Sequence, residues 1–74
     1  MANQPVQEIR LGLIRASIWA NQTDDGIRHN VIFTRLYKTV HGWQDTATFR
    51  RDDLPLISQV ADLVHMWILQ QTLS

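Results

Sequence analysis

The chain has 74 residues, with seven basic and seven acidic side chains and no cysteine. This length fits one small domain whose core is marginal by itself, and the lack of cysteine excludes disulfides and thiolate metal sites. A formal net charge of zero excludes a general polycation but allows a local basic patch. Additional stability must therefore come from tight packing or from a second subunit.

A two-residue hydrophobic period, typical of strands, begins after a short polar lead. We expect residues 1–5 to be disordered and residues 6–74 to form a single domain. Residues 6–22 have a strand pattern whose apolar phase changes at Gly12-Leu13, which indicates either a bulge or a bend between two strands. A turn is predicted over residues 21–26, where Asp-Gly is the strongest signal.

The next predicted strand, residues 28–40, has one mainly apolar and one mainly polar face. Val31, Phe33 and Tyr37 alternate along the first face, which also carries His29 and Arg35. The turn at His41-Gly42 leads to a last strand over residues 43–49. In that strand we expect Trp43, Ala47 and Phe49 to face the core, and Gln44, Thr46 and Thr48 to face outward.

Asp52-Asp53-Leu54-Pro55 is a helix start, because acids suit a first turn and proline is tolerated there. The helix is expected to end near Leu69 or Gln71. Its apolar residues cover more than the single face that a small sheet can bury, so the surplus predicts a two-fold dimer. The residues expected at this dimer interface are Leu63, Met66 and Trp67.

These elements predict an α+β domain with the order ββββα. It consists of a curved antiparallel sheet of three to four strands, followed by one C-terminal helix, and it is dimeric. Phe49 and Trp67 should be largely buried in it.

Catalytic, metal and cofactor sites are not predicted. The two Asp-Asp pairs are explained by a turn and a helix start, no serine lies in a nucleophile motif, and no glycine loop could hold phosphate. The three histidines lack metal-ligand spacing, and no apolar run could span a membrane. We therefore expect a soluble, cytoplasmic protein that is not an enzyme and needs no cofactor or metal.

The exposed face of the predicted sheet suggests nucleic-acid binding. It would combine phosphate-binding cations, hydrogen-bond donors and an indole that could stack on a base. The candidate binding residues on this face are Arg15, Trp19, Arg28, Asn30, Thr34 and Lys38. Exposed faces of antiparallel sheets are, however, commonly polar without binding anything. Arg35 lies on the buried phase, where it could pass the helix end, pair with an acid or serve the dimer interface.

Four strands and a C-terminal helix over roughly residues 13–70 resemble the transcriptional coactivator family named positive cofactor four. The strand Val31-Ile32-Phe33-Thr34-Arg35-Leu36-Tyr37 is similar to the family's strand ending in Ile-Arg-Glu-Tyr-Trp, with Arg35 and Tyr37 at the Arg and Tyr positions. Asp53-Leu54-Pro55 resembles the Asn-Pro opening of the family helix. Leu36 and Lys38 depart from the family's Glu and Trp, and this chain is neutral where the family domain is basic. The resemblance implies a homodimer whose curved sheets bind single-stranded DNA, and it adds Arg35 to the candidate binding residues.

Two hypotheses follow from the sequence. The first is a homodimer that binds single-stranded DNA or RNA and acts in transcription or DNA processing. The second is a dimeric protein-interaction module of the same fold that has no nucleic-acid ligand. Binding to oligonucleotides that weakens with salt would distinguish them.

Overall fold

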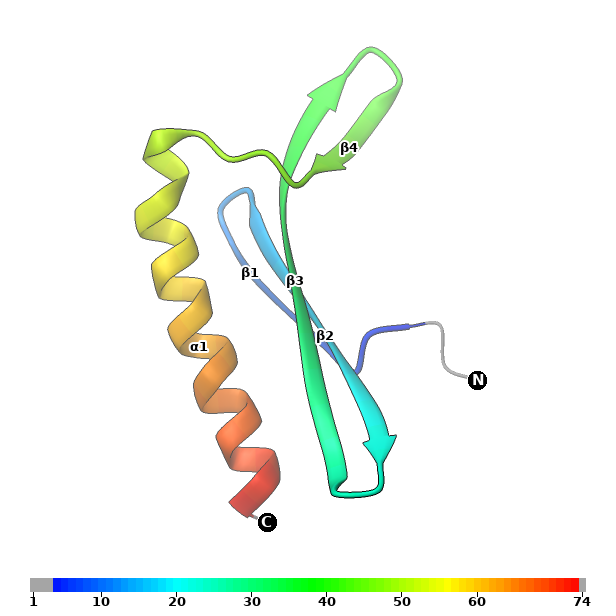
Figure 1. Ribbon diagram of the computed structural model, residues 1–74. Helices are drawn as coiled ribbons and strands as arrows, with labels where there is room; N and C mark the ends of the chain where they lie inside the picture. The colour runs from blue at the N-terminus through cyan, green and yellow to red at the C-terminus, as the bar shows by residue number, and fades with distance from the viewer. Residues whose placement is uncertain (1–3, 74) are drawn as a thin grey trace.

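The chain folds into a four-stranded antiparallel sheet followed by one long helix (Figure 1). The computed structural model describes residues 4–73. The strands lie side by side in chain order, and a 3-10 turn precedes the helix. The elements are β1 (Gln7–Leu11), β2 (Ile14–Thr23), β3 (Gly26–Thr39), β4 (Gly42–Thr46), η1 (Arg51–Asp53) and α1 (Leu54–Leu73).

The predicted order ββββα is confirmed, with shifted boundaries. The last strand is shorter than expected and ends at Thr46, and the helix continues past Gln71 to Leu73. The predicted disorder of residues 1–5 falls partly on residues 1–3, which lie outside the described residues. No helix within residues 4–73 is long and apolar enough to cross a membrane.

The change of phase near residue 12 is a tight turn between two strands, and not a bulge. Leu11 pairs with Ile14, so Gly12 and Leu13 alone form the connection. Gly12 has a φ of 61°, a backbone conformation that residues other than glycine rarely adopt. A Cβ atom there would lie 3.7 Å from Cδ1 of Leu56 on the helix, so this turn also lies against α1.

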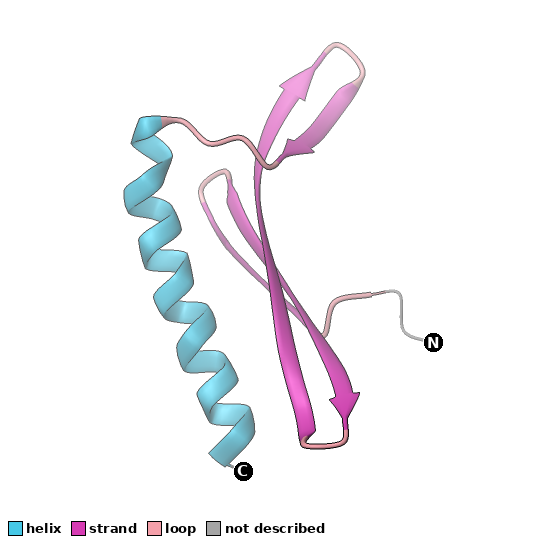
Figure 2. Cartoon of the chain, viewed as in Figure 1, coloured by secondary structure: helices cyan, strands magenta, loops and turns pink. Residues whose placement is uncertain are grey.

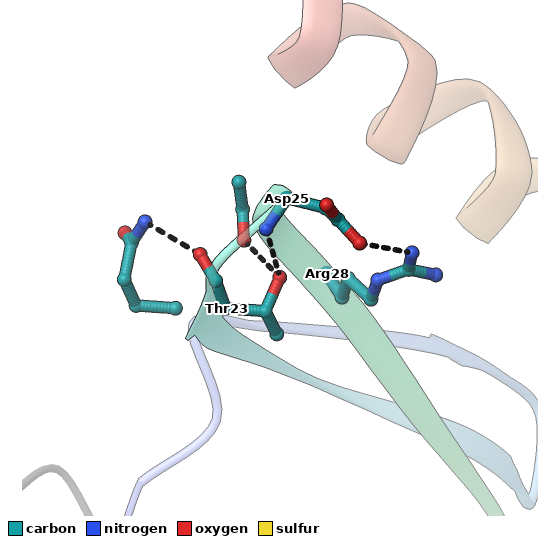
Figure 3. A network of polar contacts seen from close by, with 5 residues as sticks. Thr23, Asp25 and Arg28 are labelled. Carbon is teal, nitrogen blue, oxygen red and sulfur yellow. Dashed lines mark hydrogen bonds and ion pairs between the residues drawn. The ribbon is translucent and has the colours of Figure 1, made fainter.

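The other two turns share one construction, in which a threonine closes a two-residue loop before a glycine. In the β2–β3 turn, the Thr23 hydroxyl donates to the carbonyl of Gly26 at 2.7 Å and accepts from the backbone N–H of Asp25 at 3.3 Å (Figure 3). Thr39 makes the same two bonds in the β3–β4 turn, donating to Gly42 and accepting from the backbone N–H two residues after it. Both glycines have positive φ, 114° and 107°. Because loop length and turn type set hairpin register, these threonines help to fix which residues share a face.

The core is one layer of side chains between β2 and α1. Ile14, Ala16 and Ile18 point from β2 toward Val60 and Val64 of the helix, and these are the buried hydrophobic residues of the described chain. Around them packs a ring of partly buried apolar side chains: Ile9, Leu11, Val31, Phe33, Phe49, Leu56, Ile57, Trp67 and Ile68. Phe49 and Trp67 are thus on the core side as expected, but they are only partly buried.

The molecule is flat and long. Its dimensions are 44 × 28 × 16 Å and its radius of gyration is 13.9 Å, whereas a compact chain of this length has a radius near 11 Å. The helix covers one face of the sheet and contacts mainly β1 and β2, while the β3–β4 hairpin projects past it (Figure 2). The opposite face of the sheet has no covering layer in residues 4–73.

The small core makes a clear stability prediction. Ile18→Ala removes a fully buried side chain and should lower the free energy of unfolding by about 2–5 kcal/mol. Val40→Ala is the control, because Val40 is 96% exposed and the change should stay within about 0.5 kcal/mol. Urea denaturation measures both, and equal midpoints for the two variants would contradict the assigned core.

Candidate nucleic-acid interface

Strand register divides the sheet into two faces, because directly paired residues of antiparallel strands project to the same side. The side with Ile14, Ala16 and Ile18 packs on α1. We call the opposite side the outer face. It consists of Glu8, Arg10, Arg15, Ser17, Trp19, Asn21, Arg28, Asn30, Ile32, Thr34, Leu36, Lys38, Trp43 and Asp45.

The outer face brings together the candidate residues predicted from the strand pattern. Trp19 lies directly opposite Asn30, and Arg15 lies opposite Thr34. Arg28 is paired with Asn21 near the β2–β3 turn, and Lys38 lies at the other end of β3. The cations are therefore distributed along the length of the sheet, with an indole between them.

Trp43 belongs to this face as well, which corrects the expectation that it faces the helix. It pairs with Lys38 and is 58% exposed. Gln44 and Thr46, expected on the outer face, pair instead with Tyr37 and Arg35 on the helix side.

The reason for this correction is the short β3–β4 turn. Thr39 pairs directly with Gly42, so the turn and not side-chain hydrophobicity determines the phase of β4. The expected core residue Ala47 is exposed and lies past the end of β4, and Thr48 is also exposed. The Thr-x-x-Gly pattern at residues 39–42, which repeats that at 23–26, is the sequence signal that identifies Trp43 as an outer-face residue.

Two of the outer-face cations have acidic neighbours. Arg15 Nη2 donates to Asp45 Oδ2 at 2.6 Å, and both side chains are partly exposed. Arg28 Nη2 lies 3.6 Å from Asp25 Oδ2 in a pair that is largely exposed (Figure 3). Lys38 is exposed and forms no ion pair within the described chain. Exposed pairs are worth about 0–1 kcal/mol, so a phosphate could replace either carboxylate at low cost.

A small hollow of about 250 Å³ lies at the β4 end of the outer face. Its lining residues are Arg15, Leu36, Trp43, Gln44 and Asp45. Two buried polar atoms lack a hydrogen-bond partner, Nε of Arg15 and Oγ1 of Thr34, which pairs with Arg15 but does not line the hollow. Buried polar atoms normally have partners, but both of these atoms are shielded from the surface, so neither is available to a ligand in the hollow.

Arg35 is separated from the other candidates, because it lies on the helix side of the sheet. Its Nε donates to the carbonyl of Thr48 at 3.2 Å and lies 3.4 Å from Asp53 Oδ2. The same carboxylate oxygen accepts the backbone N–H of Arg50 at 2.8 Å, and the guanidinium carbon lies 5.9 Å from the ring centre of Tyr37. Arg35 therefore pairs with an acid, one of the alternatives expected for it. These contacts hold the segment between β4 and α1 against β3.

The predicted dimer-interface residues are in two environments. Leu63 and Met66 are exposed on α1, at 47% and 59%. Trp67 is partly buried and packs edge to face against His29 of β3, with ring centres 5.9 Å apart. A cleft of about 500 Å³ opens beside this pair, lined by Val6, Ala20, Ile27, His29, Trp67 and Gln71.

Residues 4–73 contain no group of three His, Cys, Asp or Glu side chains that could hold a metal ion. Comparison of the chain with protein-family models, with curated proteins and with solved structures finds no match. The outer face must therefore be interpreted from its own chemistry.

The position of Arg35 gives a stability prediction. Arg35→Ala should lower the free energy of unfolding by about 1.5–3 kcal/mol, because it removes charge-assisted hydrogen bonds to Thr48 and Asp53 from a mostly buried site. Arg51→Ala, whose side chain is 92% exposed beside Asp52, should change it by less than about 0.5 kcal/mol. Thermal denaturation with equal effects from both arginines would show that Arg35 has no structural role.

Proposed function

We propose that this chain is a homodimeric module that binds single-stranded nucleic acid across the outer face. Arg15, Arg28 and Lys38 bind phosphates in this proposal. Trp19 and Trp43 stack on bases and Asn30 hydrogen-bonds to the strand, whereas the hydroxyl of Thr34, the other expected donor, is buried. The protein is a binding module and not an enzyme.

The observation that carries the proposal is two tryptophans on one polar sheet face, each beside a hydrogen-bonding or cationic neighbour. Trp19 lies opposite Asn30, and Trp43 lies opposite Lys38. Eight residues of β3 separate these neighbours, or about 26 Å at 3.3 Å per residue. That length corresponds to roughly eight stacked nucleotides at 3.4 Å each. Trp43 is exposed and Trp19 is partly exposed, and indoles spaced along a groove or face are a common platform for unpaired bases.

Charge distribution supports the same interpretation. Four of the seven Lys and Arg residues lie on the outer face, with two of the seven acids. The face is therefore locally positive although the chain is neutral. Binding to a polyanion depends on such local charge and on counterion release more than on the total charge of the protein.

The hollow beside Trp43 is suited to a nucleobase. A base stacked on the indole would lie beside the Arg15 and Asp45 side chains that line the hollow. Bases in a duplex are already stacked and cannot enter the hollow, so single strands are the preferred ligand.

A protein-interaction module of the same fold is the alternative. It is favoured by the ion pair between Arg15 and Asp45, which neutralises one cation, and by the exposed Ile32 on the outer face. Titration with an oligonucleotide decides between the two functions.

The proposal predicts micromolar binding of a labelled oligothymidine of about 20 nucleotides, measured by fluorescence anisotropy at low salt. Trp43→Ala should weaken binding by about 1–3 kcal/mol and leave the salt dependence unchanged, because it removes stacking alone. Lys38→Ala should reduce the slope of log K against log salt by about 0.7, the value for one phosphate contact on a single strand.

Two controls complete this titration. Arg51→Ala removes an exposed cation outside the outer face and should alter neither affinity nor slope. Duplex DNA of the same length should bind less tightly than the single strand. If the unmutated chain shows no binding at tens of micromolar protein, the protein-interaction module is the function that remains.

Self-association is the second part of the proposal. Light scattering at micromolar concentration should give twice the 8.6 kDa chain mass. Met66→Glu adds a charge to an exposed apolar position of α1 and should shift the protein toward monomers if the helix contributes to the interface. Ser58→Glu, at another exposed position of the same helix, is the matched control. A monomeric unmutated chain would contradict the dimer.

A further inference from the structure

β3 is much longer than β4, one of its two neighbours in the sheet. It has 14 residues, and β2 pairs with the part from Gly26 to Arg35. β4 pairs only with residues from Arg35 to Thr39. Residues 26–34 of β3 therefore have a neighbouring strand on one side only, and we call this stretch the open edge.

The alternation of the ladder shows which backbone groups the open edge exposes. The N–H of Leu36 donates to the carbonyl of Leu13 at 2.8 Å, next to the pair Arg35 and Ile14. In an antiparallel ladder the residues that bond across to one neighbour alternate with those that point away. Even-numbered residues of β3 thus bond to β2, and the N–H and C=O groups of Ile27, His29, Val31 and Phe33 point outward. No hydrogen bond within residues 4–73 uses any of these groups.

The other sheet edges are shorter and better protected. On β1, which has five residues, the outward backbone groups belong to Glu8 and Arg10. β4 also has five residues, and Asp45 is among its outward positions. Charged residues and short length are the usual means of preventing edge pairing. The outward residues of the open edge include no Asp, Glu, Lys, Arg or Pro.

We propose that the open edge pairs with the same edge of a second copy, antiparallel and about a two-fold axis at Asn30. Residues 26 and 34 are equally distant from Asn30, so this register uses the whole edge. It pairs Ile27 with the partner's Phe33, and His29 with the partner's Val31. Every outward N–H and C=O of the edge then has a partner, which no other register achieves before β4 interferes.

Side chains on the outer face agree with this register. Arg28 lies opposite the partner's Ile32, and the two Asn30 amides meet at the axis. A register centred on Arg28 would instead place two guanidinium groups opposite each other, which is destabilising. The edge is therefore complementary to itself, and this is the argument for a second copy over an unrelated strand.

The pairing goes beyond the proposed function, because it assigns the surface of self-association and does not require nucleic acid. A two-fold axis perpendicular to the sheet keeps equivalent faces on the same side. The outer faces of the two copies then form one continuous surface, and both helices lie on the other side. Leu63 and Met66, exposed on α1, are on the side where the partner's helix also lies.

Disulfide formation at the axis tests the register. The chain contains no cysteine, so Asn30→Cys introduces a single thiol. Across the two-fold axis the paired Cα atoms would be about 4.5 Å apart, as in a pair without direct hydrogen bonds, and this distance permits a disulfide. In Arg28→Cys the two thiols would be offset by four residues, about 13 Å. Mild oxidation should give covalent dimers of the first variant and none of the second on a non-reducing gel. Equal yields from both, or none from Asn30→Cys, would overturn this register.

A second pair of variants tests the edge without cysteine. Ile27 is 60% exposed, so Ile27→Lys should leave the monomer folded while placing a charge on the open edge. It should raise the dimer dissociation constant at least tenfold in sedimentation equilibrium. Val40→Lys, in the β3–β4 turn and outside the edge, should leave that constant unchanged. An unchanged constant for Ile27→Lys would place the interface elsewhere. If both tests give the expected results but the chain binds no oligonucleotide, the edge pairing stands and only the proposed nucleic-acid binding is refuted.

Discussion

The contact between β2 and α1 is the interaction on which the rest of this structure depends. Ile14, Ala16 and Ile18 meet Val60 and Val64 there, and outside this layer the apolar side chains described are at most partly buried. Burying a valine or isoleucine side chain fully is worth about 1.5–3 kcal/mol and an alanine contributes less, so these five give little reserve against the entropy of ordering a chain of this size. The narrow core also explains the shape, because the helix lies mainly over β1 and β2 and the long hairpins extend past it.

Much of the fold could be predicted from the sequence, because local signals agree with the tertiary structure. The alternation in β2 identifies Ile14, Ala16 and Ile18 as core residues, and the change of phase at Gly12 locates the first turn. Aspartates before a proline mark the start of the helix region. In each case a short segment contains the whole signal.

The composition of β4 alone does not predict which face of the sheet each of its side chains occupies. Trp43 is large and apolar, and hydrophobicity alone assigns it to the core. Its actual side is decided by the pairing of Thr39 with Gly42 across a two-residue loop. For Arg35 the alternation indicates the correct face, but its contacts with Thr48 and Asp53 depend on the path of the chain after β4. Sequence periodicity does not describe that path.

The outer face combines features that oppose each other. Carboxylates beside Arg15 and Arg28 keep these side chains in place before any ligand is present, but they also compete with phosphate. A ligand must replace Asp45 to gain the full charge of Arg15. Lys38 has no such competitor in the described chain, so it can attract a phosphate at longer range. Such an arrangement favours contacts that exchange easily over a rigid, permanent complex.

The order of strands has a consequence for how the chain reaches its native state. Each strand pairs with its neighbour in sequence through a connection of two residues, so the sheet can assemble from local hairpins, which form within about 1–10 μs. The contacts of α1 with β1 and β2 connect segments about 40 residues or more apart. Closing that long loop is the slow part of folding. The chain loses conformational entropy on closure before burial of the helix valines offsets that loss. Docking of the helix is thus the step that should limit the folding rate.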